Sequence, residues 1–153
     1  MEGPSDELIV QKAYLQKYGV LPIEDGIDVI TIRGLSFKRY LEIADKLSKF
    51  VTVITDNDGD IEKNINKKYG EKYINHPRIR ICYGKDENYS TLEPQLIKAN
   101  GVDFLNGILE TTYSTEKELI KYMTSPSKKS ECAMLLFDSE EILQIPEYIA
   151  NAI

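Results

Sequence analysis

The sequence predicts an α/β domain with a parallel sheet flanked by helices and a mostly helical C-terminal part. Two observations predict this class. Short apolar segments that suit strands alternate with longer segments of helical periodicity. The strands are also apolar throughout rather than alternating, which is typical of a parallel sheet covered on both faces. The 153 residues, 42% hydrophobic and 29% charged, suit one globular domain over residues 1–153.

The chain is expected to open with a helix and a strand. Residues 6–18 form the helix, with Ser5 placed to cap its start and Gly19 to end it. Residues 28–32 are β-branched and apolar, which predicts a short buried strand. Residues 33–34, Arg-Gly, are expected to turn the chain.

The next pair of elements carries the clearest pattern in the sequence. A helix is predicted over residues 36–50 with Ser36 as its cap. Its apolar residues recur at helical spacing and should share one buried face: Phe37, Tyr40, Leu41, Ala44 and Leu47. Residues 51–55 predict a second buried strand, which ends in the acidic turn 56–60.

The remaining chain is expected to be mainly helical after one more strand. A polar helix is predicted over residues 60–68 and a third strand over 79–83. Residues 125–127, Ser-Pro-Ser, are expected to form a turn between helices. The predicted C-terminal helices span about 94–110, 115–124, 129–138 and 146–152.

Composition excludes several classes of function. The net charge of −6 has the wrong sign for a protein that holds nucleic acid by counterion release alone. Cys82 and Cys132 form no CxxC motif, and with the single His76 they cannot build an ordinary zinc site. Oxygen ligands would therefore hold any metal, which favours Mg²⁺, Mn²⁺ or Ca²⁺. Without a membrane-spanning run or secretory signal, a cytoplasmic protein with reduced thiols is expected.

The acidic turn at the end of the second predicted strand is the first candidate site. Asp56 and Asp58 lie two residues apart where functional groups gather in parallel sheets, and a divalent cation would relieve their repulsion. A purely structural Asx-type turn is an alternative. An EF-hand is excluded, because Ile61 and Lys67 stand where that loop needs Gly and Glu. The strand followed by DxDG also resembles haloacid-dehalogenase phosphohydrolases, although Asp60 stands where that family has Thr or Val.

Four motifs taken in order resemble the Toprim domain of the OLD family (overcoming lysogenization defect) of ATP-dependent endonucleases. Glu2-Gly3 resembles the Glu-Gly at the end of that domain's first strand, and Asp56-Asn57-Asp58 resembles its Asp-x-Asp. The resemblance extends to a second acid four residues after the Glu, a Thr-x-Glu motif and a late lysine, which are matched by Asp6, by Thr91 with Glu93, and by Lys129. Ser130 departs from the Gly that follows this lysine in the family, so Lys128 is an alternative.

The resemblance implies the fold, the cofactor and the role of each residue. It implies a Toprim-like, Rossmann-like sheet from which the first strand is missing, and a two-metal mechanism with Mg²⁺ or Mn²⁺. Glu2, Asp6 and Asp56 would surround one ion. Asp58 and Glu93, with Thr91, would hold the other, and Asp60 would assist through water. Lys129 would neutralise charge on the scissile phosphate or the leaving oxygen.

The resemblance also implies partners and a setting. DNA would be the substrate, an ATPase domain would belong to a longer parent protein, and a homodimer is an open possibility. Bacterial defence against phage is the implied role. No phosphate-binding loop of the ATPase type occurs in this sequence, so the expected unit is the catalytic domain alone. A haloacid-dehalogenase-like phosphohydrolase and a non-catalytic or inactive fragment remain the alternatives.

Overall fold

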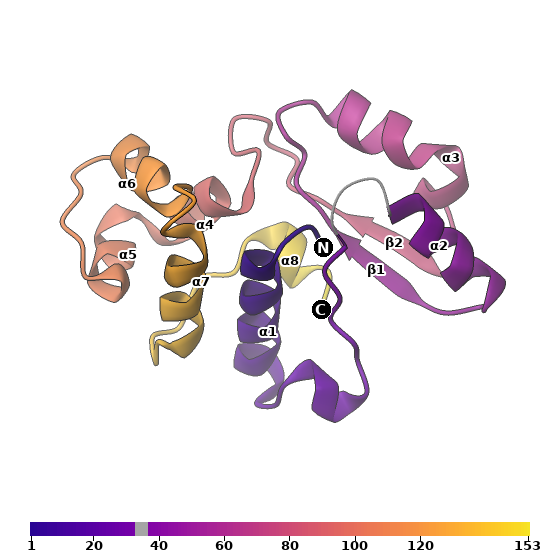
Figure 1. The fold of residues 1–153 in the computed structure, drawn as a ribbon, viewed down its shortest axis with the longest axis horizontal. Helices are drawn as coiled ribbons and strands as arrows, with labels where there is room; N and C mark the ends of the chain where they lie inside the picture. The colour runs from indigo at the N-terminus through magenta and orange to yellow at the C-terminus, as the bar shows by residue number, and fades with distance from the viewer. Residues whose placement is uncertain (33–36) are drawn as a thin grey trace.

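A two-stranded parallel sheet separates the two packed regions of the molecule (Figure 1). The computed structural model describes residues 1–32 and 37–153. Strand β1 (Val51–Ile54) pairs with β2 (Ile79–Cys82), with Val51 opposite Ile79 and Ile54 opposite Cys82. Both strands and their parallel pairing were predicted from the sequence, and the α/β class with a helical C-terminal part is confirmed.

Helices lie on both sides of this sheet. Figure 1 shows α2 and α3 beside the strands, α4 to α7 at the other end of the molecule, and α1 with α8 between them. The bounds are α1 (Pro4–Tyr18), the 3₁₀ segment η1 (Pro22–Asp25), α2 (Phe37–Lys46), the π-helical segment η3 (Glu62–Lys67), α3 (Lys68–Ile74), α4 (Leu92–Asn100), α5 (Val102–Leu109), α6 (Glu116–Met123), α7 (Lys129–Asp138) and α8 (Glu147–Ala150).

Side chains of the sheet pack into two separate hydrophobic clusters, because successive strand residues point to opposite faces. Val53 and Ile79 pack with α2, η3 and α3 in the cluster that we call the sheet core. Ile54 and Cys82 pack with α1 and α4 to α8 in the larger cluster that we call the helical core. The sheet core contains Phe37, Leu41, Val53, Ile65, Tyr69, Tyr73 and Ile79.

The start of α1 differs from the prediction. The helix begins at Pro4 with Gly3 as its N-cap, whereas Ser5 lies inside the helix and is buried. A proline suits the first helical position because its missing N–H would have no partner there. The predicted end is confirmed. Gly19 adopts φ +78° and its N–H bonds the carbonyl of Leu15, a conformation that favours glycine.

The predicted strand over residues 28–32 is wrong, because this extended segment belongs to no sheet ladder. Its only strand-like pairing within the described chain is with the N-terminal residue. The Met1 ammonium donates to the Ile30 carbonyl at 3.2 Å, and the Ile32 N–H donates to the Met1 carbonyl at 2.8 Å. Ile30 is 44% exposed, so an apolar run does not guarantee burial where no neighbouring strand covers it.

Other predicted boundaries are corrected by local geometry. In α2, Phe37, Leu41 and Ala44 are buried as expected, but Leu47 lies beyond the helix and is 64% exposed. The predicted turn at residues 33–34 and the Ser36 cap lie outside the described residues. The helix predicted over 94–110 is two helices, because Gly101 adopts φ +82°, ψ 159° between them.

The other predicted helices need only small adjustments. The 129–138 helix is confirmed, and 115–124 and 146–152 are each somewhat shorter in the structure. The polar helix predicted over 60–68 corresponds to η3 and the start of α3, and Gly70 at φ +63°, ψ 178° breaks α3 before it ends at Ile74. Among the described residues, no helix has both the length and the apolar character needed to cross a bilayer.

Candidate metal centre

The acidic turn after β1 is held in place by the residue between its two aspartates. Asn57 is 1% exposed, and its side-chain amide donates to the carbonyls of Gly84 (2.6 Å) and Asp86 (3.2 Å) in the loop after β2. Its side-chain oxygen accepts from the Gly59 N–H at 2.8 Å. Asn57 therefore ties the two strand ends together and fixes where the flanking carboxylates leave the backbone.

Asp58 lies on the exposed side of this turn. Its backbone has φ +49°, a left-handed conformation that Asp adopts more readily than most residues. Its N–H donates to the Ser90 carbonyl at 3.2 Å, which brings the turn beside the loop that leads into α4. Thr91 is the N-cap of α4, and its side chain makes no capping hydrogen bond. Asp58 and Thr91 thus belong to adjoining loops.

Glu2 reaches the same end of the sheet from the N-terminus. Its Oε1 accepts from the Thr55 hydroxyl at 2.9 Å and forms an ion pair with Lys68 Nζ at 3.3 Å. Glu2 precedes the N-cap Gly3, so it lies just outside the helix that carries Asp6. Glu2 approaches the strand end through Thr55 instead.

Asp6 is a buried acid at the start of α1. It is 9% exposed, and its Oδ2 accepts from the Gly3 N–H at 2.9 Å. Burial raises the pKa of Asp6, and the nearby Glu93 carboxylate raises it further, while the Gly3 N–H and Lys129 act in the opposite direction. Asp6 therefore accepts a hydrogen bond at the start of α1 and is also affected electrostatically by Glu93 and Lys129.

Glu93 and Lys129 form an ion pair between α4 and α7. Lys129 Nζ lies 3.0 Å from Glu93 Oε1, and the glutamate is 4% exposed. Apart from this contact, neither carboxylate oxygen meets a hydrogen-bond donor among the described residues. A cavity of about 10 Å³, room for about one water molecule, adjoins the pair. A buried carboxylate with so few donors is costly and needs a further cationic or hydrogen-bonding partner.

Asp56 lies at the electrostatic centre of these acids. Burial raises the pKa of Asp56 to about 8, with further increases from the carboxylates of Asp6, Glu93, Glu2 and Asp58. Five acids from four separate segments thus act on one another at this strand end. Lys129 lies in the same field: burial lowers its pKa, but Glu93, Asp6 and Asp56 raise it overall.

The acids gather without closing around a single point. Within residues 1–32 and 37–153, no three Asp, Glu, His or Cys side chains converge closely enough to hold a metal ion as they stand. Glu2 and Glu93 face the ammonium groups of Lys68 and Lys129, and Asp6 faces a backbone N–H. Without a divalent cation, mutually repelling carboxylates are expected to take such partners. Oxygen donors alone, one of them buried and poorly satisfied, fit a hard cation such as Mg²⁺ or Mn²⁺.

Three neighbours of this centre were not predicted from the sequence. Asn57 had been treated only as a turn residue between the two aspartates. Lys68 is the cationic partner of Glu2, and no spacing in the chain indicates that pairing. Tyr148 of α8 is buried, and Asp56, Asp6 and Glu93 all act on its hydroxyl.

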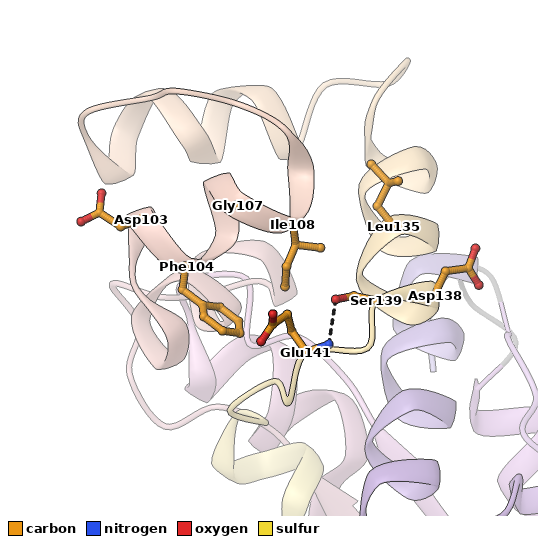
Figure 2. A pocket seen from close by; sticks show the side chains of 8 residues that line it. All are labelled: Asp103, Phe104, Gly107, Ile108, Leu135, Asp138, Ser139 and Glu141. Atoms are coloured by element: carbon orange, nitrogen blue, oxygen red, sulfur yellow. Dashed lines mark hydrogen bonds between the residues drawn. The ribbon is translucent and has the colours of Figure 1, made fainter.

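A separate hollow lies away from these acids. It has a volume of about 600 Å³ between α5, α7 and the segment that follows α7, and no predicted site residue lines it. Figure 2 shows Phe104 and Ile108 on its wall, with the carboxylates of Asp103 and Asp138 on opposite sides and pointing apart. These acids do not converge, so the hollow offers no catalytic constellation.

An acidic α/β domain whose carboxylates meet at the end of a parallel strand is the class that fold and site define. Within this class, the family model for the TOPRIM domain of overcoming lysogenization defect protein-like proteins matches residues 1–58. Residues 1–58 are therefore similar to an OLD-like Toprim domain. The match covers less than half of the 153 residues and includes Glu2, Asp6, Asp56 and Asp58, while Thr91, Glu93 and Lys129 lie beyond it. No curated protein and no solved structure matches the chain.

Proposed function

We propose that residues 1–153 form the catalytic domain of a divalent-metal-dependent DNA endonuclease. The observation that carries the proposal is the gathering of five acids at the end of β1, where burial and then the carboxylates of the other four raise the pKa of Asp56 to about 8. Such crowding is unfavourable unless cations neutralise it, and Toprim domains generally bind divalent metal ions.

The proposed cofactor is a pair of Mg²⁺ or Mn²⁺ ions. Glu2, Asp6 and Asp56 are the proposed ligands of one ion, and Asp58 and Glu93, with Thr91, those of the other. The ions would supply an activated water and neutralise charge on the attacking and leaving oxygens of the phosphodiester. The contacts of Asp58 with the loop before α4 support grouping the turn with Thr91 and Glu93.

Lys129 is the proposed contact to the substrate phosphate. Its ammonium lies 3.0 Å from Glu93 and its side chain is 42% exposed, so it can face both the acids and a bound anion. Once Glu93 is engaged by a cation, the ammonium is free to hydrogen-bond a phosphate oxygen and stabilise charge on the leaving oxygen. Lys128 instead pairs with Glu131 at 2.7 Å, which favours Lys129 for this role.

The net negative charge of the chain affects how it would bind DNA. A net charge of −6 gives weak attraction for DNA at physiological salt, so a basic surface from elsewhere would hold the duplex. We propose an ATPase domain in a longer parent protein, or a second copy of this chain, as that source. Phage defence in the bacterial cytoplasm is the proposed setting.

The acids around Asp56 favour this proposal over a haloacid-dehalogenase-like phosphohydrolase. In that alternative Asp56 would act as a nucleophile and would need to be ionised near neutral pH. The neighbouring carboxylates of Glu2, Asp6 and Glu93 oppose its ionisation in the metal-free chain. Glu2, Asp6 and Glu93 are instead suited to ligating divalent cations together with Asp56.

Nicking of supercoiled plasmid in the presence of Mn²⁺ tests the function. Asp56→Ala and Glu93→Ala should each abolish cleavage, whereas Asp103→Ala, an acid beside the remote hollow, should leave it unchanged. Cleavage retained by Asp56→Ala would contradict the proposed site. A wild-type chain that neither cleaves DNA nor binds Mn²⁺ would favour the non-catalytic alternative.

A further inference from the structure

Tyr148 is the only residue of α8 that brings a polar side-chain atom into the described core beside the acids. It is 6% exposed, and its hydroxyl oxygen is buried without a hydrogen-bond partner among the described residues. Its helix packs against α1, the helix that carries Asp6. A buried hydroxyl left unpaired costs about 1–3 kcal/mol, so an unpaired tyrosine here indicates that a partner is missing.

The surroundings of the hydroxyl define what that partner must be. The charged groups that act on it are the carboxylates of Asp56, Asp6 and Glu93, in that order. An ionised carboxylate can only accept a hydrogen bond, so the Tyr148 hydroxyl can only donate to these acids. A carboxylate oxygen of the acid cluster is therefore the natural acceptor.

We propose that Tyr148 is a positioning residue of the metal centre, whose hydroxyl donates a hydrogen bond to the Asp56 carboxylate when that carboxylate ligates a cation. The inference rests on the proposed function, because it assigns an outer hydrogen-bond partner to a proposed ligand. Partners of this kind orient ligating carboxylates, and their loss typically costs about 10- to 100-fold in metal affinity.

The sheet core offers a matched control. Tyr73 is 4% exposed and its hydroxyl is likewise buried without a hydrogen-bond partner in the described chain. It packs with Phe37 and Ile79 and lies against Lys72 and His76, away from the five acids. Tyr73→Phe and Tyr148→Phe thus each remove one buried hydroxyl, and only the second removes a hydroxyl on which the proposed ligands Asp56, Asp6 and Glu93 act electrostatically.

The test is the dissociation constant for Mn²⁺, followed by electron paramagnetic resonance of the free ion, in the wild type and both variants. Tyr148→Phe should raise this constant by about 10- to 100-fold, whereas Tyr73→Phe should change it less than about twofold. Urea unfolding of the same metal-free samples separates the roles. A structural hydroxyl would shift the unfolding midpoint and leave the affinity unchanged.

The outcomes distinguish this inference from the function on which it rests. If the wild type binds Mn²⁺ and Tyr148→Phe binds it equally well, the positioning role is overturned and the proposed function stands. Equal weakening by Tyr73→Phe would also overturn it, because the effect would then be general loss of packing. If the wild type itself does not bind Mn²⁺, the proposed function fails, and the role of Tyr148 fails with it.

Discussion

The two hydrophobic cores differ in the polar groups they enclose. The helical core is bordered by four buried polar or charged residues of α1 and α4, namely Ser5, Asp6, Lys12 and Glu93. The helices of the sheet core bury none among the described residues and leave large apolar side chains exposed on and after α2: Ile43, Leu47 and Phe50. The helical region therefore holds its acids in low dielectric, while the sheet region supplies the exposed end of the acidic turn.

This difference explains why the candidate centre lies where the two regions meet. Asp56 and Asp58 come from the strand end, whereas Asp6, Glu93 and Lys129 come from helices of the larger core. Lys12, also buried, donates to the carbonyls of Phe137 and Ser139 at the end of α7 and so joins α1 to the helix that carries Lys129. Neither region contains the whole set of acids.

The largest expected effect tests whether the two cores unfold together. Leu41 and Leu136 are both 0% exposed, one in each core. Leu41→Ala and Leu136→Ala should each lower the free energy of unfolding by about 2–5 kcal/mol. Because the two strands are shared, urea unfolding followed by circular dichroism should remain a single transition. Two transitions, of which each variant shifts only one, would show that the regions are independent.

The next largest expected effect is a pH dependence of stability caused by Asp56, which lies where the two regions meet. The pKa of Asp56 is raised from 3.8 to about 8 in the folded chain, so folding favours its protonated form. Its contribution to stability is present below about pH 4 and is lost as the pH rises through 8. Metal-free protein should lose on the order of 2–4 kcal/mol between pH 5 and pH 9.

The Asp56→Asn variant tests whether Asp56 causes this loss of stability with rising pH. It should flatten the pH dependence of the melting temperature without removing it, because burial also raises the pKa of Asp6. Mn²⁺ should stabilise the wild type more at pH 8 than at pH 5, since the ion competes with the proton. An unchanged slope in Asp56→Asn would place the titrating group elsewhere.

A smaller effect is expected from the lysine of the helical region. Lys129→Met leaves Glu93 buried without its cation, and this should cost about 1–3 kcal/mol in metal-free protein, allowing for the half-exposed lysine. Mn²⁺ should recover part of this loss by taking the place of the ammonium. Chemical denaturation with and without Mn²⁺ measures both quantities, and a loss that Mn²⁺ does not reduce would count against Glu93 as a ligand.

The smallest effect is expected from the adjacent lysine. Lys128 forms an exposed i,i+3 pair with Glu131, and screening by solvent leaves such pairs with little effect on stability. Lys128→Met should therefore leave both stability and plasmid nicking nearly unchanged. Nicking lost in Lys128→Met but retained in Lys129→Met would reverse the choice between the two lysines.

Local patterns predicted the parts of the site that follow one strand. The apolar run before Asp56 indicated β1, and the Asp-Asn-Asp-Gly sequence indicated the turn that the structure contains. The segment 28–32 has an equally apolar pattern but forms no strand, because burial there depends on a neighbouring chain rather than on its own residues. Periodicity cannot supply that neighbour.

The resemblance to family motifs identified the site residues that come from the helical region. Local sequence patterns could not predict where these residues lie in the fold. Glu93 was expected as a metal ligand, and its 4% exposure follows only from the packing of α4 against the other helices. The pairing of Lys68 with Glu2 spans 66 residues of sequence, and Tyr148 is separated by 55 or more residues from the acids that act on it. Such contacts depend on tertiary packing, which local propensities do not specify.

The central claim is that acids from both regions form one cation site. Mn²⁺ titration of the wild type beside Asp56→Asn and Glu93→Gln tests it most directly, with Asp103→Asn as the remote control. We predict that both site variants weaken Mn²⁺ binding at least about tenfold while the control binds like the wild type. Unaltered Mn²⁺ affinity in Glu93→Gln, with wild-type binding intact, would contradict the claim, because the ion assigned to Asp58 and Glu93 would then have no ligand from the helical region.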